Sequence, residues 1–224
     1  MKDLRRLGKK MYKKQKIIIV GAGGFGREVF RWCEGTFDVA GFLTNNSHDL
    51  DNLNINVPII GDPAKYTPNA EDRFIFAIGD VKVKKTLTAG LKSRGAKFIN
   101  LIHPTAIVSK SAVFGEGVVV CPYVIISEDV KLGDFVMMNF YSSCGHDAIV
   151  GSCSILSPYS TLNGFAVLED NVFLGTHSVI TANKRVGRGS SISAGAVVIK
   201  NIPPETLTYG VPGKTIKIME ESDD

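Results

Sequence analysis

The stretch that decides the fold begins IHPTAIVSKSAVFGEGVVV, residues 102–120, and its pattern continues far beyond this point. Every sixth residue from Ile102 to Val198 is apolar, without a slip in register. The residue two positions earlier is small or β-branched along nearly the whole stretch. A period of six fits neither the period of about 3.6 of a helix nor that of 2 of a strand. It is typical of a parallel β-helix, in which three hexapeptides close one triangular coil. We therefore predict an all-β parallel β-helix over residues 102–202.

The segment before the hexads, residues 16–101, alternates strand-like and helix-like pieces. Lys16–Val20 (KIIIV) is a continuous apolar run, which is typical of a strand buried on both faces of a parallel sheet. A glycine-rich turn, GAGGFG, and a segment with helical spacing follow it. We expect a helix at 81–94 and further strands at 38–43, 74–78 and 98–101. This order predicts a small α/β domain with a Rossmann-like parallel sheet, and residues 203–224 then form a C-terminal extension.

Composition and charge exclude several classes of protein. The chain has 224 residues and a formal net charge of +4, but residues 1–15 alone hold seven Lys and Arg and one acid. The basic charge therefore belongs to a flexible tail, and no nucleic-acid partner is expected. No apolar run approaches the roughly 20 residues that cross a bilayer, and the N-terminus lacks the apolar core of a secretory signal. The four cysteines form no C-x-x-C pair, so we expect a cytoplasmic protein without disulfides or a metal site.

Four motifs accompany the hexads: KIIIVGAGGFGREVF (16–30), FAIGD (76–80), GHD (145–147) and GVPGK (210–214). Together they resemble the left-handed β-helix sugar acetyltransferases of the sialic-acid O-acetyltransferase type. That family includes N-acetyltransferases that act on the 4-amino group of nucleotide-linked amino-deoxy sugars for bacterial surface glycans such as lipopolysaccharide and O-antigen. The resemblance covers about residues 16–217 and implies a homotrimer, acetyl-CoA as the donor and a nucleotide sugar as the acceptor. Transfer to a hydroxyl of sialic acid or a related sugar is the alternative within the family.

The glycine-rich turn matches G-x-G-x-x-G between a strand and a helix, a context that suits phosphate binding. A dinucleotide site also needs an acid at the end of the second strand, but residues 41–46 read GFLTNN. A nucleotide-sugar diphosphate or a purely structural loop therefore fits better than a nicotinamide cofactor. The resemblance assigns the nucleotide to six positions: Gly23, Gly24, Phe25, Thr44, Asn45 and Gly79. Family members often carry His in place of Phe25 and an Asp pair in place of Thr44 and Asn45, which leaves the base open.

His146 is the candidate catalytic residue. It lies two residues past an apolar hexad position and beside Gly145, so we expect it on a turn of the β-helix and not in its interior. Asp147 can orient the imidazole and raise its basicity, and the resemblance implies that this pair is the general base and its support. A neutral imidazole can accept the proton of a sugar amine or hydroxyl during attack on a thioester. A turn amide near Gly164 is a candidate oxyanion donor, and the buried hexad position of Cys144 argues against a covalent intermediate.

The resemblance also implies the remaining contacts. Acetyl-CoA is expected to lie between neighbouring β-helices against main chain at Thr176 and Ala194, with Lys214 in the closing segment. Asn139 is either a sugar ligand or a turn residue that satisfies its own backbone. Two functions of other classes stay open, namely a nicotinamide-binding regulatory protein and a purely structural β-helix.

Overall fold

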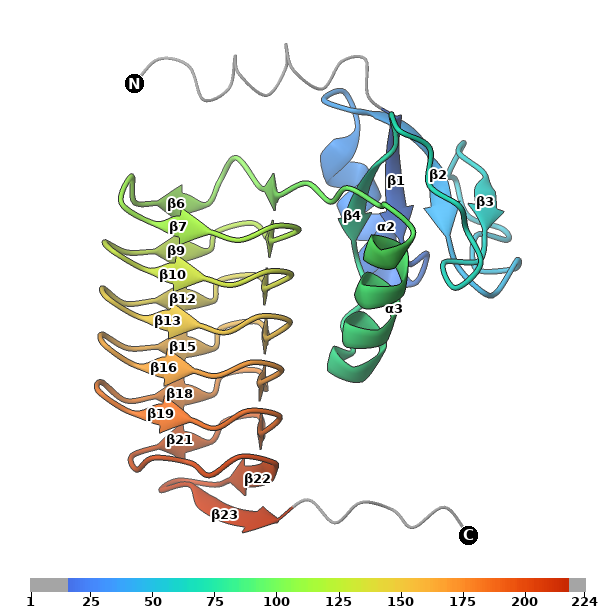
Figure 1. The fold of residues 1–224 in the computed structure, drawn as a ribbon. Helices are drawn as coiled ribbons and strands as arrows, with labels where there is room; N and C mark the ends of the chain where they lie inside the picture. Colours follow the sequence, from blue (N-terminus) through green and yellow to red (C-terminus); the bar gives the residue numbers. More distant parts are fainter. Residues whose placement is uncertain (1–15, 218–224) are drawn as a thin grey trace, which may run out of the picture. The chain divides into compact units, whose positions relative to one another are not determined.

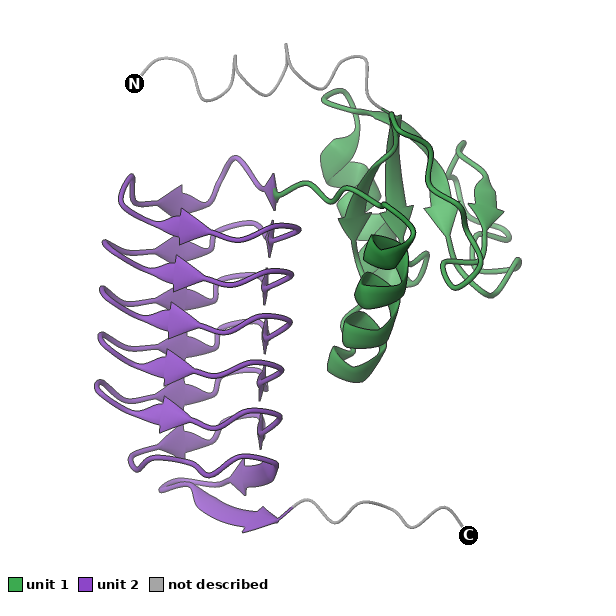
Figure 2. Ribbon diagram, in the orientation of Figure 1, with its two compact units in different colours: residues 1–100 green, residues 101–224 purple. Residues whose placement is uncertain are grey.

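The computed structural model describes residues 16–217 and divides into two compact units, Met1–Asn100 and Leu101–Asp224 (Figure 2). The predicted basic tail at 1–15 lies outside the described residues. So do residues 218–224 of the predicted C-terminal extension.

The first unit is a small α/β domain. Its elements are β1 (Lys16–Val20), α2 (Gly24–Cys33), β2 (Asp38–Leu43), β3 (Ile59–Gly61), β4 (Arg73–Phe76) and α3 (Val81–Ser93). The four strands pair in parallel in the order β3-β2-β1-β4. The apolar run of β1 is central and its last four residues are at most 1% exposed, as expected of a strand covered on both faces.

The strand predicted at 98–101 does not form. Phe98 makes only an isolated bridge with Phe74. Three residues later the chain has already joined the second unit, because Leu101 pairs with Val119 one coil further on. Strand β3 is too short and too weakly patterned to be predicted, and it completes the sheet instead.

The second unit stacks short strands, most of them of two residues, in three sheets that are parallel except for the last strand, β23 (Figure 1). Sheet 1 holds β5 (Leu101–Ile102), β8 (Val119–Val120), β11 (Met137–Met138), β14 (Ile155–Leu156), β17 (Phe173–Leu174), β20 (Ser191–Ile192), β22 (Thr206–Tyr209) and β23 (Lys214–Lys217). Sheet 2 holds β6 (Ile107–Val108), β9 (Ile125–Ile126), β12 (Ser143–Cys144), β15 (Thr161–Leu162), β18 (Val179–Ile180) and β21 (Val197–Val198). Sheet 3 holds β7 (Val113–Phe114), β10 (Lys131–Leu132), β13 (Ile149–Val150), β16 (Val167–Leu168) and β19 (Arg185–Val186).

The hexad residues fill the interior of this triangular stack. From Val120 to Val198 each of them is at most 3% exposed. Ile102 belongs to the first coil and is 42% exposed, because no earlier coil of the β-helix stacks on it. Burial of the continuous aliphatic column is the main source of stability for a repeat structure of this kind.

From Gly117 to Gly195, each corner turn carries one residue in the left-handed conformation. Asp129, Phe135 and Tyr141 illustrate the rule at successive corners, with φ of 58°, 57° and 58°. We name the corners by the sheets they join, so that corner 1–2 leads from sheet 1 to sheet 2 and corner 2–3 from sheet 2 to sheet 3.

The segment set apart as a C-terminal extension continues the β-helix. Ile202 bridges to Val186, and β22 pairs in parallel with β20. β23 then turns back antiparallel along β22 and ends the sheet. The β-helix therefore extends beyond residue 202, the end predicted from the hexads alone.

Candidate active site

The backbone around His146 is held at corner 2–3 by the neighbouring coils. The Gly145 N–H donates to Leu162 O at 2.7 Å, and the Asp147 N–H donates to Glu128 O at 2.9 Å. The carbonyl of His146 in turn accepts the Phe165 N–H at 3.0 Å. These bonds fix the turn on both sides, while the His146 side chain remains 60% exposed. A rigid turn thus presents a solvent-accessible imidazole, as the sequence predicted.

The His146 and Asp147 side chains form a hydrogen-bonded pair. Nδ1 of His146 lies 2.9 Å from Oδ2 of Asp147. A carboxylate can only accept, so Nδ1 carries the proton in this pair. In the neutral imidazole Nε2 then holds the lone pair, which is the arrangement that a general base requires.

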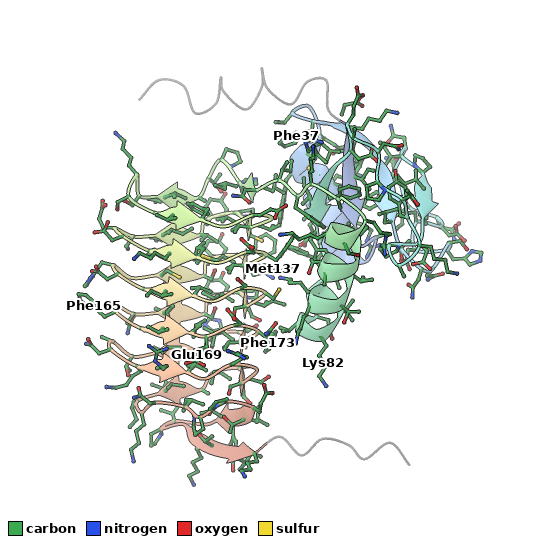
Figure 3. The ribbon with its side chains drawn as sticks, viewed as in Figure 1. Phe37, Lys82, Met137, Phe165, Glu169 and Phe173 are labelled. Atoms are coloured by element: carbon green, nitrogen blue, oxygen red, sulfur yellow. The ribbon has the colours of Figure 1, made fainter. Side chains whose placement is uncertain are left out.

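Two residues of the next coil shape the space around the imidazole. The Phe165 ring meets it edge-on, with centroids 5.1 Å apart and planes at 87°. Phe165 lies at the edge of the stack (Figure 3). A Cβ on Gly164 would stand 2.7 Å from His146 Nε2. Any larger residue at this position would therefore displace the imidazole.

Cys144, two residues before His146, faces the interior and is 1% exposed. Burial raises the pKa of its thiol to about 12. A thiol that stays protonated and enclosed is a poor nucleophile, which agrees with transfer that involves no covalent enzyme intermediate.

The residues expected to contact the sugar and acetyl-CoA lie at another corner. Asn139, Thr176 and Ala194 follow β11, β17 and β20 at corner 1–2, whereas His146 lies at corner 2–3. Lys214 begins β23 in the last part of sheet 1. Asn139 Oδ1 accepts the Phe140 N–H at 2.8 Å, so its oxygen already satisfies the local backbone. Within one chain, the structure does not bring these residues and His146 together.

The predicted nucleotide residues gather at the carboxyl ends of the parallel strands in the first unit. Gly23, Gly24 and Phe25 follow β1, Thr44 and Asn45 follow β2, and Gly79 follows β4. This edge is where open α/β sheets bind ligands.

The start of α2 suits an anionic group. Gly23 caps the helix without a side-chain hydrogen bond, and no acid lies in the first turn. Its first backbone N–H groups therefore meet no carboxylate from the first turn of the helix. A Cβ on Gly26 would collide with the carbonyl oxygen of Gly21, so the last glycine of the motif allows the helix to pack tightly against β1.

A cavity of about 590 Å³ begins at this helix terminus. Its lining consists of Gly24, Phe25, Arg27, Glu28, Arg31, Leu53, Asn54 and Ile55. Two arginines give it cationic character, while burial raises the pKa of Glu28 against the opposing influence of Arg27. Of the six predicted nucleotide residues, only the first-turn pair Gly24 and Phe25 lines this cavity.

The sequence reasoning missed Asp49. Its carboxylate accepts the Thr44 hydroxyl at 2.6 Å and the Asn46 side-chain amide at 2.6 Å. The loop after β2 thus brings a carboxylate to Thr44 and Asn46. No sequence pattern indicated this, because the contact depends on how residues 44–49 turn back on themselves.

Two further observations concern the described residues, 16–217. No group of three or more His, Cys, Asp or Glu side chains is arranged to hold a metal ion there. Neither of the helices in this range has the length and apolar character needed to cross a membrane.

A small α/β domain followed by a parallel β-helix is also the fold of several left-handed β-helix sugar N-acetyltransferases. Residues 16–91 match the family described as the PglD N-terminal domain. PerB from Caulobacter crescentus, which was solved with CoA and GDP-perosamine, is 29% identical to this chain. The match covers 91% of this chain and 98% of the PerB chain, with a TM-score of 0.81. The acetyltransferase domain of PglB from Neisseria gonorrhoeae is 27% identical over 91% of this chain and 100% of that one, with a TM-score of 0.83.

A curated relative matches a smaller part. The 2,3,4,5-tetrahydropyridine-2,6-dicarboxylate N-acetyltransferase of Staphylococcus aureus (strain bovine RF122 / ET3-1) is 40% identical over 58 residues, which are 26% of this chain and 24% of the relative. The match thus spans about a quarter of that relative's length. Together the comparisons confirm the predicted resemblance and fold class. PerB was solved with CoA, and the PglB acetyltransferase domain was also solved with acetyl-CoA.

Proposed function

We propose that this protein transfers the acetyl group of acetyl-CoA to the 4-amino group of a nucleotide-linked amino-deoxy sugar, with His146 as the general base. The observation that carries the proposal is the His146–Asp147 hydrogen bond of 2.9 Å on an exposed, rigid corner. The similarity to PerB over 91% of the chain supports the sugar-nucleotide class of acceptor.

The proposed reaction needs two things from the protein, namely a base and a surface that positions the two substrates. Acetyl-CoA supplies an activated acyl group as a thioester. The amine nitrogen forms the new C–N bond while the C–S bond of the thioester breaks. His146 Nε2 accepts the proton that the amine loses, Asp147 stabilises the resulting imidazolium, and the departing thiolate takes up a proton. A positioned base of this kind contributes about 10²–10⁴-fold to the rate.

We further propose that the working enzyme is a homotrimer whose sites lie between subunits. His146 lies at corner 2–3, whereas the cofactor positions Thr176 and Ala194 lie at corner 1–2. Residues on different corners of one prism cannot face one molecule on its outside, but they can face each other across two prisms. A shared site therefore requires a second copy.

The base is tested with His146→Ala. We expect a folded protein whose CoA release with a panel of UDP-, GDP- and dTDP-linked 4-amino sugars falls by at least about 10²-fold. Free and CMP-linked sialic acid in the same panel distinguish transfer to oxygen from transfer to nitrogen. A variant within a few-fold of the wild type contradicts the assignment, and absence of CoA release by the wild type with every acceptor contradicts the proposed function.

Subunit mixing tests the shared site. His146→Ala and Thr176→Trp are each expected to be inactive alone, the second because a large side chain blocks the cofactor surface. Co-expressed, they form mixed assemblies in which an intact corner 2–3 meets an intact corner 1–2, and part of the activity returns. No recovery in assemblies shown to be mixed argues against a site between subunits.

A further inference from the structure

Corner 1–2 carries a column of stacked aromatic rings, one from each of four successive coils. We call Tyr123, Tyr141, Tyr159 and His177 the aromatic column. Successive ring centroids are 5.1, 4.8 and 4.7 Å apart, and successive planes differ by only 10°, 8° and 5°. The rings therefore lie nearly parallel and follow the coils of the β-helix.

This column occupies a backbone conformation that bulky residues usually avoid. All four residues have φ between 58° and 61°, in the left-handed region where Gly, Asn and Asp are favoured. The tyrosines remain 46–52% exposed, so burial alone does not offset that cost. Ring stacking between neighbours adds to the stability of this corner, since offset aromatic pairs attract beyond the area that they bury. The proposed acetyl transfer makes no use of these rings.

The column stops where the next coil places a glycine. Gly195 follows His177 by one coil and has φ of +69°, so its backbone repeats the same corner conformation. Nothing among the described residues lies within 4 Å of the position that a Cβ on Gly195 would occupy. Both residues are exposed. One face of the His177 imidazole stacks on Tyr159, and no ring of the column covers the other face. We call the open space beside that face, over Gly195, the slot.

The surroundings of this slot suit a nucleotide. The Gly195 N–H donates to Thr176 O at 2.8 Å, which keeps the floor of the slot rigid. On the far side, the turn from Gly210 to Gly213 is hydrogen-bonded to Val197 at 3.1 and 2.8 Å. Lys214 follows this turn directly and is exposed. Because this turn is bonded two residues beyond Gly195, Lys214 is the candidate partner for a phosphate attached to a flat ring in the slot.

We propose that the adenine ring of acetyl-CoA stacks on His177 over Gly195 and completes the aromatic column. The inference rests on the proposed function, and it deepens it by naming the residues that hold the nucleotide end of the donor. A purine is flat and π-rich, and bases stack readily on aromatic side chains, histidine included. The base of the nucleotide sugar is a weaker candidate, because the residues expected to hold that substrate lie in the first unit, at the carboxyl ends of its strands.

The test compares two variants at opposite ends of the column. His177→Ala removes the face on which adenine stacks, whereas Tyr123→Ala removes a ring three coils away. Binding to the intact protein is measured by calorimetry with CoA and with 4′-phosphopantetheine, which lacks the adenosine. We expect His177→Ala to raise the Kd of CoA about tenfold and to leave that of 4′-phosphopantetheine unchanged. Tyr123→Ala is expected to change neither.

A second pair of variants tests the slot itself. Gly195→Tyr adds a ring to the column, fills the slot and is expected to weaken CoA binding at least about tenfold. Gly195→Asn tolerates the left-handed backbone without filling the slot, so it is the matched control and should bind nearly as the wild type does.

The outcomes separate the two proposals. Wild-type Kd values for CoA in both His177→Ala and Gly195→Tyr overturn the inference and leave the proposed function standing. Equal weakening of CoA and 4′-phosphopantetheine also overturns it, because the column would then act only on the shape of the corner. A wild-type protein that binds no CoA overturns both proposals.

Discussion

Replacing Gly164 with alanine tests whether the activity depends on the position of the His146 imidazole. The added Cβ would stand 2.7 Å from Nε2 and 2.8 Å from Cε1, whereas ordinary contacts begin at about 3.4 Å. The imidazole must therefore move by about 0.7 Å. It cannot do so freely, because Nδ1 is bonded to Asp147 at 2.9 Å and the Phe165 ring packs against the imidazole. The backbone itself accepts alanine, since Gly164 is not among the residues with positive φ.

The expected loss is in catalysis and not in folding. A displacement of about 1 Å from a productive geometry can cost about 10²-fold in rate, so a shift somewhat below that predicts a fall in kcat of roughly 10- to 100-fold. KM for acetyl-CoA should change little, because the cofactor positions lie at corner 1–2. The melting temperature should stay close to that of the wild type.

The assay is thiol release from acetyl-CoA under saturating substrates, with thermal unfolding measured in parallel. Ala182→Ser is the matched control, because Ala182 occupies the same corner one coil beyond Gly164 and two coils from His146. It adds one atom without approaching the imidazole and should keep full activity. A Gly164→Ala enzyme with kcat within twofold of the wild type would refute the reasoning, since the ring position would then not matter.

Three further predictions concern the same β-helix. Asp147→Asn should lower kcat at least about tenfold, the scale of one charge-assisted hydrogen bond lost from His146; an unchanged kcat would mean that the pair is only a surface contact. Cys144→Ala should retain kcat within a few-fold while lowering the melting temperature slightly, because the thiol is buried and protonated, and loss of turnover in a folded variant would revive a covalent mechanism. The pKa of Glu169 is held below its usual range, chiefly by the backbone N–H of Arg188 at 3.0 Å. The stability from Glu169 is therefore present at neutral pH and lost as pH falls through the lowered pKa. Glu169→Gln should melt below the wild type at pH 7, and the difference should shrink as the pH is lowered into the acid range where this carboxylate takes up its proton. A constant difference across that range contradicts this origin.

The β-helix was predictable because its pattern is redundant. A slip of one residue anywhere between Ile102 and Val198 would turn polar side chains into the interior, so the hexads admit one register. The first unit was less predictable. Strand β3 has three residues, and the strand expected at 98–101 competes with the start of the first coil, which takes Leu101 for itself.

The candidate site divides in the same way. His146 and Asp147 are neighbours in the chain, and their place beside a hexad glycine marks them without any structure. Gly164 belongs to the same site but lies one coil away, so its role depends on which residues stack above one another. The carboxylate of Asp49 beside Thr44 likewise depends on the path of a loop that has no periodic pattern.

The aromatic column lies between these cases. The 18-residue spacing of Tyr123, Tyr141 and Tyr159 can be read from the sequence once a coil is known to span 18 residues, as the pairing of Met137 with Ile155 shows. Only the tertiary structure shows that the rings are parallel and that the column ends in an open slot at Gly195.

By itself, the sequence determined the β-helix, its register and the parallel-sheet domain before it, and it marked His146 as the candidate base. These features are local or strictly periodic, and burial energy acts on each repeat in the same way. The hexad spacing also places His146 on a different corner from Thr176 and Ala194, which is the physical reason for expecting a site shared between copies. Only the tertiary structure decided which side chains meet across neighbouring coils, as the ring of Phe165 meets the imidazole of His146, because those contacts depend on where each side chain points.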